Sequence, residues 1–339
     1  MGILVDGVWH GGDARQIGAS GWEPRHEPFK GYVRAVSAGS QTKFPAEGGR
    51  CHLIVCPGCP MSHRVSMVHR IKKLNSVIST SLVRPVMGPN GREFGSVDQT
   101  APDDVTGVEY LYQLYLASDP RYSGRASTPV LWDRKSRKIV SNTYRDIFTM
   151  LNKEFGEFTD SDVDFQPPEW MAEIDKQLAT LGAGFVGAVY RCGFSRDQKD
   201  YDEHAERIGK AIPQLEQQLS DRPFLLGDRI FEPDLVLFAS LVRYDAIYLP
   251  LFKCTAHRIE DSAVLSAYIK RILRIPGVCE TFDLKSTMTH YYRSHAHINP
   301  TKIVPVVPKL SWHSAAHSPE HGPARAAFER PAEGSLPSD

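Results

Sequence analysis

The apolar and polar positions in the first half of the chain predict alternating strands and helices. Short apolar runs, which are typical of buried strands, occur at residues 51–56, 77–86, 129–133 and 138–140. Apolar residues recur at helical spacing from Met61 onward and again over about 144–153, and residues 107–118 are compatible with a helix. The last two strands flank a polar turn, which indicates a hairpin. This order of elements predicts a thioredoxin-like fold, because a plain doubly wound sheet lacks the hairpin.

The second half of the chain is predicted to be helical. Apolar positions at helical spacing form two clear faces there, and no strand signal of comparable strength occurs over 169–295. The end of the chain combines several prolines with Ala, Glu and Ser, a composition typical of disorder. We therefore expect an N-terminal extension (1–50), a thioredoxin-like thiol-binding domain (51–155), a linker (156–168), an all-helical domain (169–295) and a C-terminal extension (296–339) that is disordered from about residue 314.

The charge balance argues against nucleic acid or a membrane as a partner. The chain of 339 residues has 40 Lys and Arg against 40 Asp and Glu, so it has no excess of positive charge to attract phosphate. No apolar run approaches the roughly 20 residues that span a bilayer. The N-terminus has neither the basic start nor the long apolar stretch of a signal peptide. We therefore expect a cytoplasmic protein with six reduced cysteines.

The stretch CHLIVCPGCPMSHR (51–64) places two cysteines between a predicted strand and a predicted helix. Proline is favoured in the first turn of a helix, so Pro60 indicates that the helix begins directly after Cys59. The unpaired backbone N–H groups at a helix N-terminus favour the thiolate, which is the reactive form of cysteine. His63 and Arg64 add positive potential. Cys59 is therefore the predicted nucleophile, and Cys56 lies three residues earlier at the end of the strand.

Two other interpretations of this turn stay open. A buried cysteine often serves only as a small apolar side chain, an alternative that has more weight for Cys56 than for Cys59. Zinc binding would need a second pair of ligands, and no other Cys-x-x-Cys motif occurs. His290, His295 and His297 are not arranged convincingly for that purpose. We therefore expect no metal.

The sequence CPMSHR (59–64) resembles the Cys-Pro-Trp-Ala-His-Arg motif of the glutathionyl-hydroquinone reductases, which are the Xi-class, Omega-like glutathione transferases. The likeness covers roughly residues 25–308, and its final stretch is specific to this family among the transferases. The further matching stretches are LYLASDPRYSGRASTPVLWDRKSRKIVSN (114–142), VYRCGF (189–194), FLLGDRIFEPDLVLFASLVRYDAIYLPLFKC (224–254), IPGVCET (275–281) and HYYRSHAHINPTKIVPVVP (290–308).

The resemblance implies a two-domain fold, α/β followed by all-α, and a homodimer. It also implies a thiol exchange in which Cys59 attacks the sulfur of a glutathionyl-hydroquinone, the hydroquinone leaves, and a mixed disulfide with glutathione remains. A second glutathione then releases the enzyme. The family uses tyrosines to supply a proton and an oxyanion partner to the departing group. The matching positions are Tyr190 and one of Tyr291 and Tyr292, for which packing alone is the alternative.

The resemblance also identifies Pro129 as the cis-proline of the fold. The backbone of the preceding residue, Thr128, would then pair with the cysteine part of a bound thiol. An ordinary trans proline that opens a strand is the alternative.

Several positions around the expected thiol site depart from the family. Thr143 and Tyr144 stand where the family has a Glu-Ser pair that holds the γ-glutamyl group, although Asp146 lies one turn further on. The other departures in the thiol site are Met61 and Arg92, each in place of a tryptophan, and Thr128 in place of a valine. Three interpretations stay open: a tolerant glutathione site, a different low-molecular-weight thiol or thioether as cosubstrate for a transferase or lyase, or a protein that binds without catalysis.

Cys56 is a further departure, because the family does not require a thiol at this position. Two cysteines three residues apart can satisfy the limit of about 7 Å between Cα atoms for a disulfide. Cys56 is therefore a candidate resolving thiol that would replace the second glutathione. A glutathione-conjugating transferase is disfavoured, since that chemistry uses Tyr or Ser where Cys59 stands.

Overall fold

A computed structural model of the chain describes residues 2–11, 29–36, 42–95 and 101–316. These residues form two compact units. Unit 1 contains the chain up to Asp162 together with Thr281–Ala296 and Thr301–Val304, and unit 2 contains Val163–Glu280, His297–Pro300 and the chain from Pro305 onward.

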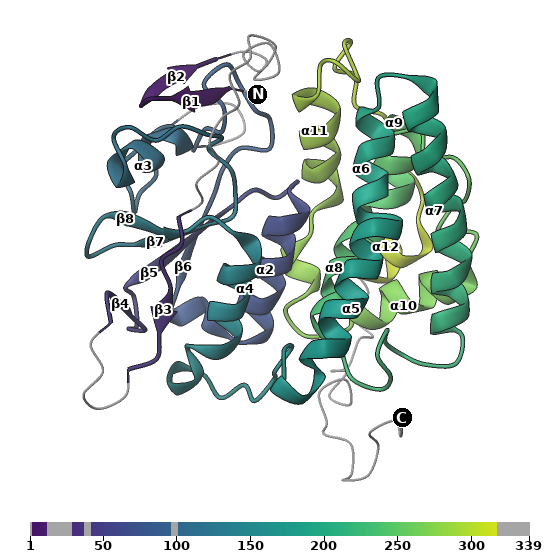
Figure 1. The fold of residues 1–339 in the computed structure, drawn as a ribbon, viewed down its shortest axis with the longest axis horizontal. Coiled ribbons are helices and arrows are strands. Elements are labelled where there is room, and N and C mark those ends of the chain that lie inside the picture. Colours follow the sequence, from purple (N-terminus) through teal and green to yellow (C-terminus); the bar gives the residue numbers. More distant parts are fainter. Residues whose placement is uncertain (1, 12–28, 37–41, 96–100, 317–339) are drawn as a thin grey trace. The chain divides into compact units, whose positions relative to one another are not determined.

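Unit 1 is built on a four-stranded mixed sheet in the order β6-β5-β7-β8 (Figure 1). Strand β5 pairs parallel with β6 and antiparallel with β7, and β7 pairs antiparallel with β8. The strands are β5 (Cys51–Val55), β6 (Ser79–Leu82), β7 (Val130–Asp133) and β8 (Lys138–Ser141). The helices are α2 (Pro60–Ile71), α3 (Leu111–Ser118), α4 (Tyr144–Lys153) and α11 (Leu284–Ser294), with 3-10 turns η1 (Leu74–Ser76) and η2 (Gly156–Phe158). The expected thioredoxin-like order of elements is confirmed.

Helices cover both faces of this sheet, which explains why β5 is apolar at every position except His52. All five residues of β5 are buried. Ile54 packs into one cluster with Leu111, Leu114 and Tyr115 from α3. Helices α2 and α4 pack against each other on the other side of the sheet (Figure 1). The site cysteines therefore lie at the end of a strand that is closed from water on both faces.

The part of the N-terminal region that the structure describes contributes two small sheets to unit 1. The strands are β1 (Ile3–Val5), β2 (Val8–His10), β3 (Val33–Arg34) and β4 (Phe44–Pro45). β1 and β2 form an antiparallel hairpin, and β3 pairs parallel with β4. Leu4 is fully buried, and its backbone exchanges two hydrogen bonds of 2.9 Å with Gly124. The hairpin is thereby tied to the core of the sheet.

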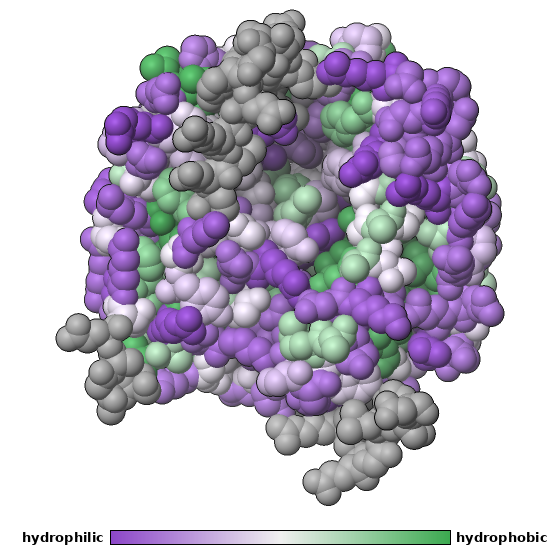
Figure 2. All heavy atoms as spheres, in the orientation of Figure 1, coloured by the Kyte–Doolittle hydropathy of each residue, from purple (hydrophilic) through white to green (hydrophobic). Residues whose placement is uncertain are grey.

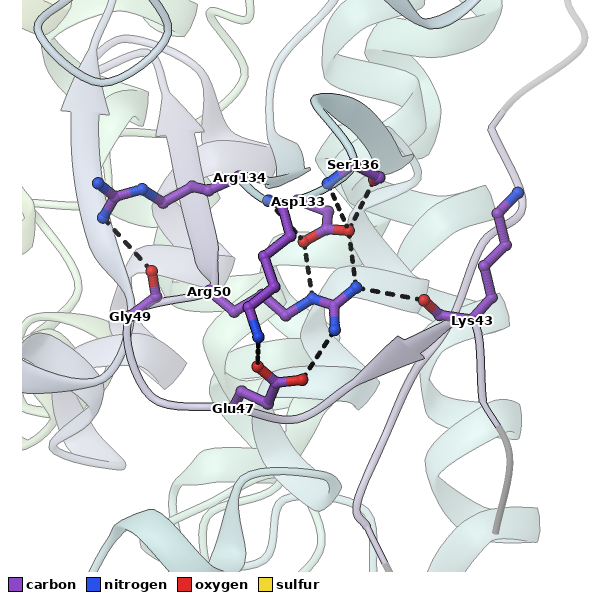
Figure 3. Close-up of polar contacts among 8 residues, drawn as sticks. Lys43, Glu47, Gly49, Arg50, Asp133, Arg134 and Ser136 are labelled. Carbon is purple, nitrogen blue, oxygen red and sulfur yellow. Dashed lines mark hydrogen bonds and ion pairs between the residues drawn. The ribbon is translucent and has the colours of Figure 1, made fainter.

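An ion-pair network joins the start of β5 to the end of β7 (Figure 3). Arg50 donates to both carboxylate oxygens of Asp133, from Nε at 2.8 Å and from Nη2 at 3.0 Å. Glu47 accepts a further bond from Arg50, and Ser136 Oγ donates to Asp133 at 2.6 Å. Burial tends to raise the pKa of Asp133, but these hydrogen bonds and the Arg50 charge hold it below its ordinary value. Asp133 therefore stabilises the folded state as a carboxylate.

We expect Asp133→Asn to lower the free energy of unfolding at neutral pH by about 2–4 kcal/mol, because it breaks a buried pair and leaves Arg50 with fewer acceptors. A carboxylate whose pKa is depressed in the fold contributes stability above its unfolded pKa, near 3.9, and loses it as the pH falls through the folded value. Urea unfolding should therefore depend less on pH below about 4 in the variant than in the wild type.

Asp160→Asn is the matched control for this prediction. Asp160 pairs with Lys73, but the two side chains are 77% and 63% exposed, so water screens the pair. We expect Asp160→Asn to change the free energy of unfolding only a little. Equal losses in the two variants would contradict the importance of the buried network.

Unit 2 is helical, as expected, and its described residues 163–280 contain no strand. Helix α8 is buried around its whole circumference and forms the centre of the unit. The helices are α5 (Met171–Leu181), α6 (Gly187–Phe194), α7 (Gln198–Leu219), α8 (Glu232–Arg243), α9 (Leu249–Leu251), α10 (Ala263–Leu273) and α12 (Ser311–Ala316). The 3-10 and π segments are η3 (Pro168–Trp170), η4 (Gly182–Val186), η5 (Tyr244–Tyr248) and η6 (Cys279–Thr281).

Two segment boundaries differ from those expected from the sequence. Residues 281–296 cluster with the sheet rather than with the helical unit, because His290 Nδ1 lies 2.6 Å from the Pro85 carbonyl and Met87 N donates to Ser294 Oγ at 3.1 Å. At the C-terminus, helix α12 continues to Ala316, past the expected start of disorder at about residue 314. The remainder of the expected disordered tail lies outside the described residues.

The visible surface of the described residues is mainly hydrophilic, and hydrophobic side chains occur there in small separate patches (Figure 2). Among the described residues, no helix combines the length and the apolar character that crossing a membrane would require.

Candidate active site

The two cysteines are joined by a tight turn between β5 and α2. Cys59 N donates to the Cys56 carbonyl at 3.1 Å, which closes a four-residue turn with Pro57 at its second position. Cys59 is the N-cap residue of α2, and Pro60 is the first residue of the helix. The Cys59 side chain makes no capping hydrogen bond, and the residue is half-buried. Its sulfur therefore lies at a helix N-terminus without being used as a cap.

Helix α11 packs directly on this turn. An added Cβ at Gly58 would overlap the Cβ and ring carbons of His290. Thr287 Oγ1 donates to the Pro57 carbonyl at 3.4 Å. Gly58 is therefore required for the close approach of α11 and not for an unusual backbone angle. The packing partner of Gly58 could not be found from the sequence, since more than 200 residues separate the two segments.

The carbonyl of Thr128 faces the Cys59 thiol. The Thr128–Pro129 peptide bond is cis, and Cys59 Sγ lies 3.6 Å from the Thr128 carbonyl oxygen. Thr128 is 7% exposed, and its Oγ1 is buried without a hydrogen-bond partner. The structure thus brings Cys59, Thr128 and Pro129 together, and it places a free hydroxyl where the family has a valine.

Arg92 brings a positive charge to the cysteine pair. Burial alone would lower the pKa of its guanidinium, but the negative charge that Cys56 and Cys59 would carry as thiolates raises it above its ordinary value. Cys56 is 1% exposed, and its backbone N donates to Ser62 Oγ at 3.2 Å. Arg92 is therefore a neighbour of the two cysteines as well as a departure from the family tryptophan.

The start of α4 carries an aromatic ring in place of a carboxylate. Thr143 is the N-cap of α4 and makes no side-chain capping bond, and Tyr144 is the first helical residue. The Arg64 guanidinium lies over the Tyr144 ring, with Cζ 5.0 Å from the ring centroid. Arg64 is 3% exposed, and its Nε and Nη2 have no hydrogen-bond partner. Asp146 supplies the acidic side chain of this first turn.

Comparison with known proteins now identifies the family. The chain is 38% identical to the glutathionyl-hydroquinone reductase PcpF of Sphingobium chlorophenolicum, over 91% of this chain and 96% of that protein. It is 37% identical to the glutathionyl-hydroquinone reductase YqjG of Escherichia coli, over 91% and 95% respectively. The chain belongs to the glutathionyl-hydroquinone reductases. The sequence resemblance to this family is thereby confirmed.

Solved structures and the match of one domain agree with this assignment. Glutathione-bound YqjG superposes with a TM-score of 0.82 at 35% identity, over 92% of this chain and 97% of that one. A Xi-class glutathione transferase from Natrialba magadii gives 0.83 at 32% identity, over 92% and 94%. Residues 198–271 match the glutathione S-transferase C-terminal domain. The chain therefore has the two-part fold of a glutathione-transferase-like thiol oxidoreductase.

The candidate tyrosines of this glutathionyl-hydroquinone reductase fall in different units. Tyr291 and Tyr292 lie on α11 of unit 1 and are 1% and 6% exposed, so both are buried. Burial raises the pKa of Tyr292 to about 12, which keeps its hydroxyl protonated at neutral pH. Tyr190 lies on α6 of unit 2, where its hydroxyl is 3.5 Å from that of Tyr248. The catalytic roles of all three tyrosines stay predictions.

Two further side chains of the site motif, Met61 and His63, contact solvent and the segment before α11 respectively. Met61, the second residue of α2, is 37% exposed. The His63 ring stacks on Phe282, and its Nε2 lies 3.0 Å from Thr281 Oγ1. His63 therefore fixes the segment before α11, a function that the sequence did not indicate. Within the described residues, no group of three or more His, Cys, Asp or Glu side chains is arranged to hold a metal ion.

Proposed function

We propose that the chain removes a thiol reductively from a thiol–aromatic conjugate, with Cys59 as the nucleophile. The observation that carries the proposal is the half-buried Cys59 at the N-terminus of α2, with its sulfur 3.6 Å from the Thr128 carbonyl of a cis peptide. Backbone N–H groups at a helix N-terminus favour a thiolate there. The family assignment supplies the substrate class, because both relatives are glutathionyl-hydroquinone reductases.

The chemistry begins with attack of the Cys59 thiolate on the sulfur of the conjugate. A sulfur–sulfur bond forms while the bond from sulfur to the ring carbon breaks, and its electron pair stays on the ring. The ring carbon takes a proton, so the hydroquinone leaves reduced and the thiol remains on Cys59 as a mixed disulfide. A protonated tyrosine can donate to the oxygen or carbon that gains charge. The family resemblance assigns this donation to Tyr190 and to one of Tyr291 and Tyr292.

Glutathione is the first candidate cosubstrate, since the relatives are named for glutathionyl substrates and the YqjG structure contains glutathione. The start of α4 favours a second candidate, a low-molecular-weight thiol without a γ-glutamyl group. The Arg64 guanidinium stacks on the Tyr144 ring there. No carboxylate is present at positions 143 and 144 to pair with a ligand ammonium. The loss of one charge-assisted contact costs about 1.5–3 kcal/mol, or roughly tenfold to a hundredfold in affinity. A homodimer, which the family implies, and a cytoplasmic location, which the sequence pattern suggests, are further proposals.

A matched series of conjugates tests this proposal. One hydroquinone would be linked to glutathione, γ-glutamylcysteine, cysteinylglycine or cysteine, and its release would be followed with the corresponding free thiol as reductant. A glutathione enzyme should lose at least about tenfold in kcat/KM when the γ-glutamyl group is removed. A change below about threefold would favour the second candidate. No release from any conjugate, with the Cys59 thiol intact, would leave a binding protein on the same fold.

A further inference from the structure

The start of α4 lies at the end of the sheet where the Cys59 sulfur is held. Strand β7 begins directly after the cis Thr128–Pro129 bond, and the Thr128 carbonyl lies 3.6 Å from Cys59 Sγ. Strand β8 runs antiparallel to β7 with Ser141 opposite Leu131, so the chain leaves β8 beside the start of β7 and enters α4. Neighbouring strands are about 4.8 Å apart. A ligand held at Cys59 can therefore extend to the first turn of α4.

This first turn is open to a ligand and has no side-chain cap. Thr143 is the N-cap residue of α4, but its side chain makes no capping hydrogen bond, and Tyr144 is the first residue of the helix. Both residues are half-buried rather than enclosed. The backbone N–H groups and the dipole at the start of a helix favour an anion. The turn is therefore better suited to a negative group than to a positive one.

Arg64 adds a buried positive charge to the same turn. Its guanidinium lies over the ring of Tyr144, with Cζ 5.0 Å from the ring centroid. Arg64 is 3% exposed, and its Nε and Nη2 atoms are buried without a hydrogen-bond partner. Among the described residues, no carboxylate forms an ion pair with Arg64. A buried cation that is neither paired nor hydrogen-bonded is costly, so an external acceptor would stabilise it.

The two unpartnered nitrogens of Arg64 form the edge of a guanidinium that binds a carboxylate. Arg50 shows this geometry in the same unit, because its Nε and Nη2 donate to the two carboxylate oxygens of Asp133 at 2.8 and 3.0 Å. Bidentate pairs of this kind are among the strongest hydrogen bonds that side chains form. Arg64 presents the same two donors with no acceptor. The group that fits this edge is therefore a carboxylate.

We propose that Arg64 and the first turn of α4 form an anion subsite, which selects a thiol whose far end carries a carboxylate and no ammonium. This inference rests on the proposed function, because it concerns the thiol part of the conjugate that Cys59 attacks. It deepens that function by naming the charge of the cosubstrate. An ammonium would lie beside a guanidinium and the positive end of a helix, and neither Thr143 nor Tyr144 could neutralise it.

Three conjugates of one hydroquinone test the inference, since they differ only in the charge of this end group. The thiol is glutathione, which has both an ammonium and a carboxylate there, glutaryl-cysteinylglycine, which has the carboxylate alone, or 4-aminobutanoyl-cysteinylglycine, which has the ammonium alone. The reduced full-length protein would be mixed in excess with each conjugate. Release of the hydroquinone would be followed in a single turnover, which requires no second thiol.

In the wild type, we expect the glutaryl conjugate to react at least as fast as the glutathione conjugate. The aminobutanoyl conjugate should react at least about tenfold more slowly than the glutaryl conjugate, the factor for one charge-assisted hydrogen bond. Arg64→Gln should reduce this preference to less than about threefold, and Arg64→Lys should keep part of it, since the charge remains but the fork is lost. Thr143→Glu should favour the aminobutanoyl conjugate, because it places a carboxylate at the start of α4.

Arg70→Gln is the matched control for Arg64→Gln. It removes the same charge from the last turn of the same helix, where the residue is exposed. The control should keep the wild-type preference among the three conjugates. A purely structural role for Arg64 would lower the thermal midpoint and slow all three conjugates alike, so the ratios of their rates distinguish the two roles.

Two outcomes would overturn the inference while leaving the proposed function intact. One is a glutathione conjugate that reacts faster than the glutaryl conjugate, which would show that the ammonium is bound, with Asp146 of the same turn as its partner. The other is an unchanged preference in Arg64→Gln. Release of hydroquinone from none of the three conjugates, with the Cys59 thiol intact, is a different result, since it would overturn the proposed function and this inference with it.

Discussion

Replacement of Cys59 by serine is expected to lower turnover of a thiol–aromatic conjugate by roughly three orders of magnitude or more, because the covalent route requires a thiolate at this position. A serine hydroxyl is far less acidic and would not form a disulfide. The fold should be unaffected, since the Cys59 side chain makes no capping bond and its position is fixed by the backbone turn. Release of hydroquinone and the thermal midpoint are the two measurements.

Cys279→Ser is the matched control, because Cys279 is the other half-buried cysteine among the six. Burial, with a smaller contribution from Glu280, raises the pKa of the Cys279 thiol, so it should be mostly protonated and slow to react. Iodoacetamide on the native protein should therefore label Cys59 first and Cys279 later, and the control variant should keep full turnover. Preferential labelling of Cys279, or activity retained in Cys59→Ser, would contradict the assignment of the nucleophile.

The sheet and its helices could be predicted from local pattern, because each element of unit 1 carries its own signal. The run CHLIVC is apolar except for His52, because β5 is covered on both faces, and Pro60 marks the start of α2. The placement of α11 carries no such signal. Its grouping with the sheet depends on His290, Ser294 and Thr281 bonding to segments more than 200 residues earlier, which no local pattern encodes.

The candidate site likewise contains residues that the sequence predicts and residues whose surroundings only the structure shows. The positions of Cys59 and Pro129 follow from local chemistry and from the family motif. Arg92 could be identified from the sequence only as a departure, because its meaning depends on which side chains surround it. The structure supplies that information: the charge of Arg92 lies near Cys56 and Cys59, and its Nη1 is buried without a hydrogen-bond partner among the described residues. Arg64 and Tyr144 are a second case, since their stacking joins the starts of two helices 80 residues apart.

The second large predicted effect is a loss of stability and activity when the contact between the cysteine turn and α11 is disturbed. Gly58→Ala is expected to lower the free energy of unfolding by about 2 kcal/mol, because the new methyl group overlaps the inner atoms of the His290 side chain, which cannot rotate away as a flexible chain end could. The turn or α11 must move in response. A displacement of about 1 Å at the nucleophile is enough to cost roughly a hundredfold in rate.

Urea unfolding and kcat/KM would be measured for Gly58→Ala beside Gly156→Ala, where an added Cβ has no atom within 4 Å. The control should be neutral or slightly stabilising, since alanine restricts the unfolded chain. The double variant Gly58→Ala with His290→Gly removes the ring and the Cβ that the new methyl group overlaps, and it should be more stable than the sum of the single losses predicts, by about 1 kcal/mol or more. Additive losses would show that α11 does not hold the cysteine turn, and the dependence of Cys59 on this packing would then have to be abandoned.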